Sequence, residues 1–179
     1  MNEDLLIQQA GRKDLDAWEK LIHLYKRPIY RFIYRMVHHQ ADADDLSQLV
    51  FLSAFKHIDS FKVGTNFRAW FYQIAKHLCV DFFRRRSKEE KKRIPLIENE
   101  AMTPAHSTDS EIGLNDLQKR VAEALETLPE SQKIIMTLHL EGLSHQEISR
   151  IINRPEATVR WRLFYARKKL KNILSDYLH

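Results

Sequence analysis

The sequence is poor in the residues that build tight turns, disulfides and membrane spans. Its 179 residues include 4 glycines and 5 prolines, too few for the many turns of a β-sandwich or barrel. The single cysteine, Cys79, excludes an intramolecular disulfide and is typical of a reducing cytoplasm. Unbroken apolar runs such as residues 49–52 are only four residues long, whereas a spanning helix needs about 20. These absences favour an all-α cytoplasmic protein.

Residue patterns typical of catalysis or metal binding are also missing. The sequence contains no glycine-rich phosphate loop and no motif that pairs a nucleophile with a base. Its 9 histidines are scattered, without the spacing of zinc ligands. The chain begins Met1-Asn2-Glu3-Asp4, which is acidic, whereas a secretory signal begins with basic residues followed by an apolar stretch. We therefore expect a non-enzyme with no metal, no cofactor, no small-molecule substrate and no targeting signal.

Charge is distributed unevenly along a chain of otherwise ordinary composition. Hydrophobic residues make up 44% and charged residues 30%, as in soluble globular proteins, and the net charge is +5. Residues 1–93 carry +6, residues 94–131 carry −6 and residues 132–179 carry +5. The sequence therefore places an acidic segment between two basic ones.

Residues 94–115 show no sustained apolar period and contain Pro95, Pro104 and Gly113 among polar residues. Such a composition is typical of a linker. We predict two small helical domains, residues 1–93 and 116–179, joined by a flexible acidic linker over 94–115. A single helical domain with a long polar loop is the alternative.

Apolar spacing predicts three helices in the N-terminal half. Positions 29, 32, 33, 36 and 37 follow the pattern of an amphipathic helix. A second helix begins at the acidic residues 42–45, since acids in a first turn suit the helix dipole. The clearest apolar stripe runs from Phe67 to Phe82, with Thr65 or Asn66 as the expected N-cap.

The C-terminal half has the pattern of a helix-turn-helix. A helix starts near Pro129, with Ser131 as the expected cap, and stops at Gly142. Residues 144–147 spell a capping box, Ser-His-Gln-Glu, that opens a second helix. Pro155 can open a third, longer helix whose outer face is basic. Such a helix can enter the major groove of DNA, although the basic face could instead merely keep an exposed helix soluble.

Three segments together resemble bacterial RNA polymerase sigma factors of the sigma-70 family, in the extracytoplasmic-function (ECF) group of stress regulators. They are Asp42-Ala43-Asp44-Asp45-Leu46-Ser47-Gln48-Leu49-Val50-Phe51, Phe67-Arg68-Ala69-Trp70-Phe71-Tyr72 with Asp81-Phe82-Phe83-Arg84-Arg85, and the C-terminal pieces around Leu128-Pro129-Glu130, Glu141-Gly142-Leu143-Ser144 and Thr158-Val159-Arg160-Trp161-Arg162. The resemblance covers nearly the whole chain apart from the linker. It implies promoter-specific initiation, with DNA melted by binding energy alone and without ATP.

By this resemblance, the first segment binds core RNA polymerase at its β′ clamp helices, with a further contact at the β flap. An acid usually follows the glutamine in the family, where this chain has a leucine, which shifts a polar contact towards a hydrophobic one. The implied polymerase-binding residues are Asp42, Asp44, Asp45, Gln48, Leu49 and Phe51.

The middle segment would recognise and melt the −10 element of the promoter. Phe61 is either part of a base-binding pocket or an anchor of its loop to the core. The three arginines at 84–86 would meet phosphates. The implied −10 residues are Phe61, Lys62, Gly64, Thr65, Asn66, Tyr72, Gln73, Lys76, His77, Arg84, Arg85 and Arg86.

The third C-terminal helix would read the −35 element. For Trp161, packing on a neighbour and contact with DNA are both open. The family also implies an anti-sigma protein, often membrane-bound, as a further partner. The implied −35 residues are Thr158, Arg160, Trp161, Arg162, Phe164, Tyr165 and Lys168.

One other functional class fits part of the sequence. A stand-alone transcription regulator would combine the C-terminal helix-turn-helix with a helical sensor domain and bind DNA as a dimer on palindromic half-sites. The acidic helix at 42–55 and the aromatic helix at 67–82 argue against it, because a sensor domain needs neither.

Overall fold

The structure is a computed structural model that describes residues 3–93 and 116–175. Within these ranges the chain is helical and contains no β-strand, which confirms the predicted all-α class. The predicted linker, residues 94–115, lies outside the described residues. The elements are α1 (Glu3–Gly11), α2 (Leu15–Val37), α3 (Gln40–His57), the 3-10 turn η1 (Ile58–Ser60), α4 (Phe67–Arg93), α5 (Asp116–Glu126), α6 (Glu130–Leu140), α7 (His145–Ile152) and α8 (Glu156–Ser175).

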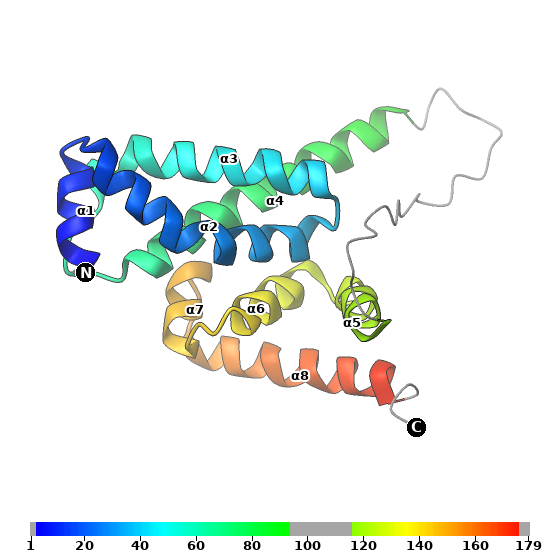
Figure 1. The fold of residues 1–179 in the computed structure, drawn as a ribbon. Coiled ribbons are helices and arrows are strands. Elements are labelled where there is room, and N and C mark those ends of the chain that lie inside the picture. Colours follow the sequence, from blue (N-terminus) through cyan, green and yellow to red (C-terminus); the bar gives the residue numbers. More distant parts are fainter. Residues whose placement is uncertain (1–2, 94–115, 176–179) are drawn as a thin grey trace.

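Helices α1 to α4 form the N-terminal unit around an aromatic core. The predicted apolar positions of α2, from Ile29 to Val37, are all buried, as are Phe67 and Phe71 of α4. Phe71 lies with its ring centroid 5.2 Å from those of Tyr25 and Phe51, so one α4 side chain packs against both α2 and α3. Figure 1 shows α2 lying between α3 and the C-terminal helices.

Local capping explains where these helices begin and end. Asp14 accepts hydrogen bonds from two amides in the first turn of α2, and His38 in the left-handed region (φ 52°) ends that helix. Asn66 caps α4, because its Oδ1 accepts the Ala69 amide at 2.7 Å. The prediction of a cap at Thr65 or Asn66 is thereby confirmed at Asn66.

Helices α5 to α8 form the C-terminal unit, with α7 and α8 as the helix-turn-helix. The capping box is confirmed: Ser144 Oγ accepts the Glu147 amide at 3.2 Å, and the Glu147 carboxylate accepts the Ser144 amide at 2.8 Å. Gly142 adopts a φ of 77°, which favours glycine and ends α6. The expected cap at Ser131 is wrong, because α6 already begins at Glu130 after Pro129.

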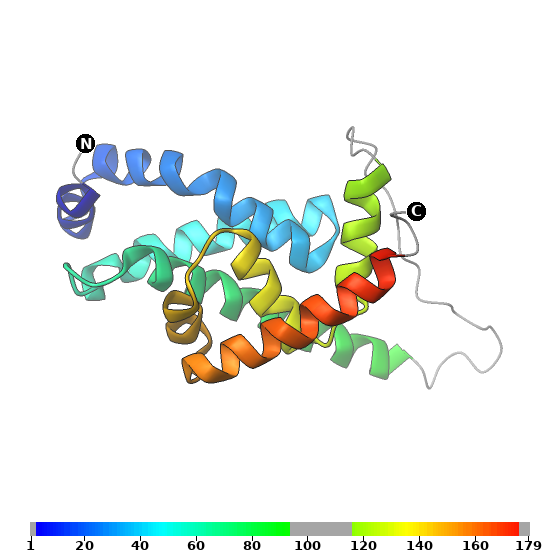
Figure 2. The ribbon, with the colours of Figure 1, turned by 90° about the horizontal axis from the view of Figure 1, so that it is seen from below.

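The two units pack directly against each other. Helix α6 contacts α2, and α7 contacts α4, so the buried apolar side chains of both units form one continuous cluster. In Figure 1 and Figure 2, α6 lies between α2 and α8, in agreement with its contacts to both helices. The chain therefore places α3 and α8 on opposite sides of the molecule.

Candidate functional site

Helix α3 presents a mixed acidic and apolar surface on the side away from the C-terminal unit. Leu49 and Leu52 expose 44% and 50% of their surface and lie next to each other on this face. Asp44, Asp45 and Gln48 are exposed beside them. Leu52 was not among the predicted polymerase-binding residues, although it follows Leu49 by three positions and so shares its face.

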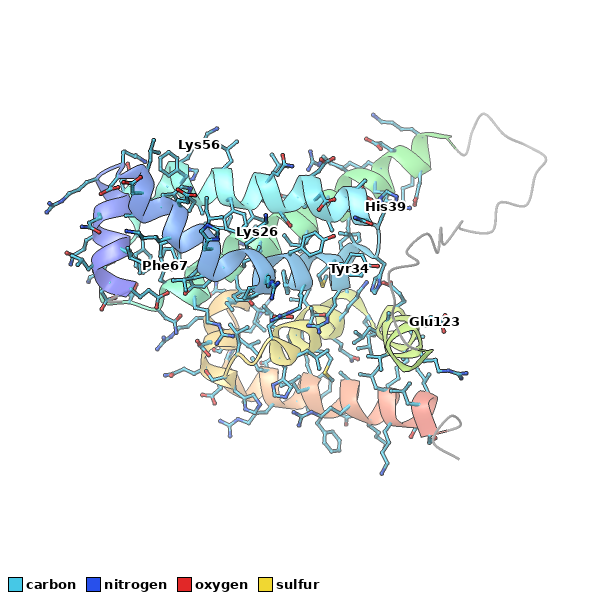
Figure 3. All side chains as sticks on the ribbon, in the orientation of Figure 1. Lys26, Tyr34, His39, Lys56, Phe67 and Glu123 are labelled. Carbon is cyan, nitrogen blue, oxygen red and sulfur yellow. The ribbon has the colours of Figure 1, made fainter. Side chains whose placement is uncertain are left out.

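Two predicted members of this surface have other contacts. Phe51 is half-buried and packs edge-on against Phe71, so it belongs to the core as well as to the edge of the surface. Asp42 lies in the first turn of α3, where its carboxylate sits 3.1 Å from the Nδ1 of His39, the N-cap residue. Figure 3 shows His39 at one end of α3 and Lys56 near the other.

The loop before α4 is exposed except at its start. Lys62, Gly64 and Thr65 are exposed, and Gly64 has a φ of 85°, which other residues rarely adopt. Phe61 is only 8% exposed, and its ring lies 5.2 Å from Phe67 and 5.3 Å from Trp70. In this arrangement Phe61 anchors the loop to the core.

The face of α4 that carries several predicted −10 residues is partly covered by the C-terminal unit. Tyr72 is fully buried, and burial raises its pKa to about 12. Lys76 is half-buried and donates to the Ile151 carbonyl at 3.3 Å, and burial lowers its pKa. His77 remains exposed, with its pKa lowered by partial burial and by Lys76 nearby. Tyr72, one of the predicted −10 residues, is therefore not on an exposed face, because its ring packs edge-on against Phe32 of α2, with 5.6 Å between the ring centroids.

Two further parts of the predicted −10 surface differ in exposure. Gln73 is half-buried on the same helix. The arginines at 84–86 are exposed on the last turns of α4, where Arg84 and Arg86 make surface ion pairs with Asp81 and Glu90. The structure thus leaves these three guanidinium groups available to phosphates.

The outer face of α8 combines exposed aromatic and basic side chains. Trp161, Phe164 and Tyr165 expose 58%, 61% and 43% of their surface, and the Trp161 and Tyr165 rings lie 4.6 Å apart. Arg160 and Lys168 are exposed on the same helix. Thr158 and Arg162 are half-buried, while Val159 and Leu163 are buried in the core. Trp161 therefore packs on a neighbour of its own helix and still presents a free aromatic surface.

Between the two units lies a polar cluster that the sequence did not predict. The Glu141 side chain is 1% exposed and accepts hydrogen bonds from Arg31, at 2.9 Å, and from Arg35. Arg68 donates to the Glu141 backbone carbonyl at 2.5 Å. These partners are between 73 and 110 positions apart in the chain, so no local pattern could reveal the cluster.

A second contact between the units is centred on a buried lysine. Lys133 donates to the Met36 carbonyl at 2.8 Å and to Glu126 at 2.6 Å. Although burial opposes it, hydrogen bonds from His38 and Lys133 lower the pKa of Glu126 to about 2. Glu126 is thus held ionised where α5 and α6 meet the end of α2.

Other titratable groups of the described residues form no further site. No group of three or more His, Cys, Asp or Glu residues there could hold a metal ion. Cys79 is 1% exposed, and burial raises its pKa to about 12, so its thiol is a core group. None of the helices in the described ranges is both long and apolar enough to cross a membrane.

Comparison with known families gives two matches, one in each unit. Residues 21–89 match the family model for sigma-70 region 2, and residues 118–170 match that for sigma-70 region 4. The first match contains α3, the loop and most of α4. The second contains the helix-turn-helix.

Individual proteins are similar over nearly the full chain. The chain is 28% identical to the ECF RNA polymerase sigma factor SigW of Bacillus subtilis, over 95% of both chains. It is 27% identical to the ECF RNA polymerase sigma-E factor of Escherichia coli K12, over 96% of this chain and 94% of that protein. Among solved structures, the sigma factor RpoE of Bartonella quintana in complex with the anti-sigma factor NepR matches with a TM-score of 0.73 and 25% identity, covering 88% of this chain and 96% of that one.

Proposed function

The chain belongs to the ECF group of the sigma-70 family and directs promoter-specific transcription initiation by RNA polymerase, and we propose which of its surfaces carries each step. The observation that supports this assignment most is the separation of two distinct exposed surfaces. One is the acidic and apolar face of α3, and the other is the aromatic and basic face of α8. Nothing in the structure favours a stand-alone regulator, since such a protein has no use for the α3 surface.

The α3 surface binds core polymerase in this proposal, at the β′ clamp helices. Leu49 and Leu52 supply apolar area that is exposed in the chain alone, and Asp44, Asp45 and Gln48 surround them with polar groups. An apolar centre with a polar rim is the usual anatomy of a protein interface. The β flap is the proposed second contact of the polymerase, made by the C-terminal unit.

The loop at 62–66 and the adjoining face of α4 recognise and melt the −10 element. Lys62, Thr65 and His77 are exposed there. Melting requires unstacking, and stacking or pocket contacts to single-stranded bases return about 1–3 kcal/mol per base. Binding energy alone can therefore favour the open strand. On this proposal the chain has no catalytic activity of its own and works in the cytoplasm.

The outer face of α8 reads the −35 element. Arg160 and Trp161 lie in the first two turns of α8, the part of a recognition helix that reaches base edges. An arginine can bind guanine through two hydrogen bonds, which contribute about 1–3 kcal/mol of discrimination. Lys168 lies further along the helix and meets phosphates, which adds affinity that depends on salt.

An anti-sigma protein is the proposed regulatory partner. The Bartonella quintana relative was solved with its anti-sigma factor NepR. A second solved complex, CnrH with the cytosolic domain of CnrY, has the same fold, with a TM-score of 0.74 at 22% identity and coverage of 97% of both chains. We expect the inhibitor of this chain to cover the α3 surface, because that surface is exposed in the chain alone.

The assignments can be tested by tethered cleavage, since the native thiol of Cys79 is buried. An iron–EDTA reagent is attached to Gln48→Cys or Lys168→Cys, and each protein is bound to core polymerase on a promoter located by its transcript start. We expect the probe at 48 to cut the β′ subunit and the probe at 168 to cut DNA near −35. Glu19→Cys, on an exposed position of α2, is the control. DNA cleavage from position 48, or none near −35 from position 168, would overturn the assignment.

A further inference from the structure

The contact between the two units is polarised: the N-terminal unit supplies mainly donors and the C-terminal unit mainly acceptors. Side chains of the N-terminal unit donate to carboxylates and carbonyls of α7 and of the turn between α6 and α7. In the described part of the chain, the bond from Lys133 to the Met36 carbonyl runs the other way. The donating residues are Arg31, Arg35, Asn66, Arg68 and Lys76.

Three of these donors converge on one residue. One carboxylate oxygen of Glu141 accepts a hydrogen bond from Arg35, and the other lies 2.9 Å from Arg31 Nη2. Arg68 donates to the backbone carbonyl of Glu141. The arginines come from two helices, α2 and α4, so the N-terminal unit builds this cradle without help from α6. Without Glu141, the three guanidinium groups would repel one another across a partly desolvated surface.

The cradle continues along α4 into the predicted −10 surface. Asn66 donates its amide to Glu147 at 3.0 Å, and Lys76 donates to the Ile151 carbonyl at 3.3 Å. Both residues were predicted to bind the −10 element. A row of cations and amide donors that meets only anionic or carbonyl oxygens has the chemistry of a surface for a phosphodiester strand.

We infer that Arg31, Arg35 and Arg68 form a phosphate-binding site for the promoter strand, which Glu141 occupies when the two units are closed. The inference rests on the proposed role of α4 and its loop in −10 binding. The Glu141 and Glu147 carboxylates stand where backbone phosphates bind in the open form. The C-terminal unit and DNA therefore compete for the same hydrogen-bond donors.

This competition leaves the α3 and α8 surfaces untouched. Leu49 and Leu52 on α3, and Trp161 and Phe164 on α8, remain exposed in the closed form. The polymerase can thus engage α3 before the units separate, whereas the −10 strand cannot bind until Glu141 has left its arginines.

The inference can be tested on the full chain without polymerase, by fluorescence anisotropy with a labelled, mixed-sequence single-stranded 20-mer. Glu141→Gln removes the competing carboxylate charge, and because breaking a buried ion pair is costly, we expect at least about tenfold tighter binding. Glu19→Gln makes the same change in net charge on an exposed part of α2 and should bind like the parent. Glu141→Asp keeps the charge but shortens its reach, and it serves if Glu141→Gln fails to fold by circular dichroism.

The arginines are then tested in the Glu141→Gln background. Adding Arg31→Gln and Arg68→Gln should abolish the gain and reduce the slope of log affinity against log salt by about 1.4, or 0.7 per lost phosphate contact. Lys56→Gln, on the opposite face in Figure 3, removes one positive charge outside the cradle and should have little effect. The inference would be overturned if Arg31→Gln and Arg68→Gln lowered the affinity, per charge removed, by no more than Lys56→Gln does. It would also be overturned if Glu141→Gln and Glu19→Gln bound the strand equally well. Failure of the proposed function would instead appear as absent transcripts with core polymerase, independently of this binding.

Discussion

The two exposed leucines of α3 offer the sharpest test of the polymerase-binding surface. Leu49 and Leu52 are about half-exposed, so an interface that covers them buries about half of each side chain. Complete burial of a leucine contributes about 1.5–3 kcal/mol, so each residue should contribute about 1 kcal/mol. Their combined replacement by Asp should cost about 2 kcal/mol, which is roughly a thirtyfold loss of affinity for core polymerase.

The assay for this double variant is equilibrium binding of labelled protein to core polymerase. Phe51 is left intact, because it packs against Phe71 and its loss would disturb the core. Leu15→Asp is the matched control, since Leu15 is 66% exposed at the start of α2, where an acid suits the helix dipole. Unfolding of the double variant should change by less than about 0.5 kcal/mol, as expected for surface positions. Unchanged affinity for the polymerase, with the fold intact, would refute the assignment of α3.

Three further predictions concern separate parts of the molecule. Arg160→Ala should weaken recognition of the −35 element by about 1–3 kcal/mol, seen as lower transcription from a cognate promoter, while core binding stays unchanged, because Arg160 is exposed and pairs with Glu156 at the surface; loss of both would show a folding role instead. Native Cys79 should resist iodoacetamide at pH 8 and react in urea, since it is 1% exposed; labelling of the folded protein would contradict its place in the core. The lowered pKa of Glu126 means that its bonds contribute stability above its ordinary pKa of 4.5, and this stability should be lost as the pH falls from 4.5 towards 2. Glu126→Gln should flatten this part of the pH dependence in urea unfolding, and an unchanged profile would exclude the assignment.

Local signals in the sequence predicted much of the helical structure. The apolar stripes of α2 and α4, the capping box at Ser144 and the stop at Gly142 are short-range features, and the structure confirms them. The sequence did not predict the first half of α2, because Pro28 follows it and proline usually ends a helix. In the structure the helix continues through Pro28, from Leu15 to Val37.

Long-range packing could not be predicted in the same way. Glu141 lies in a segment that indicated only a helix stop, and nothing nearby shows that two arginines more than 100 positions away surround it. The burial of Tyr72 is also a tertiary effect, because an amphipathic pattern on α4 cannot show that this ring packs against Phe32 of α2. The roles of individual residues on α3, α4 and α8 remain predictions.

The central claim is that this chain gives core RNA polymerase the ability to start at specific promoters. The most direct measurement adds the purified protein to cognate core polymerase on fragmented genomic DNA and sequences the 5′ ends of the transcripts. We predict discrete start sites that depend on the protein and share two upstream elements near −35 and −10. Start sites that are the same with and without the protein would contradict the account.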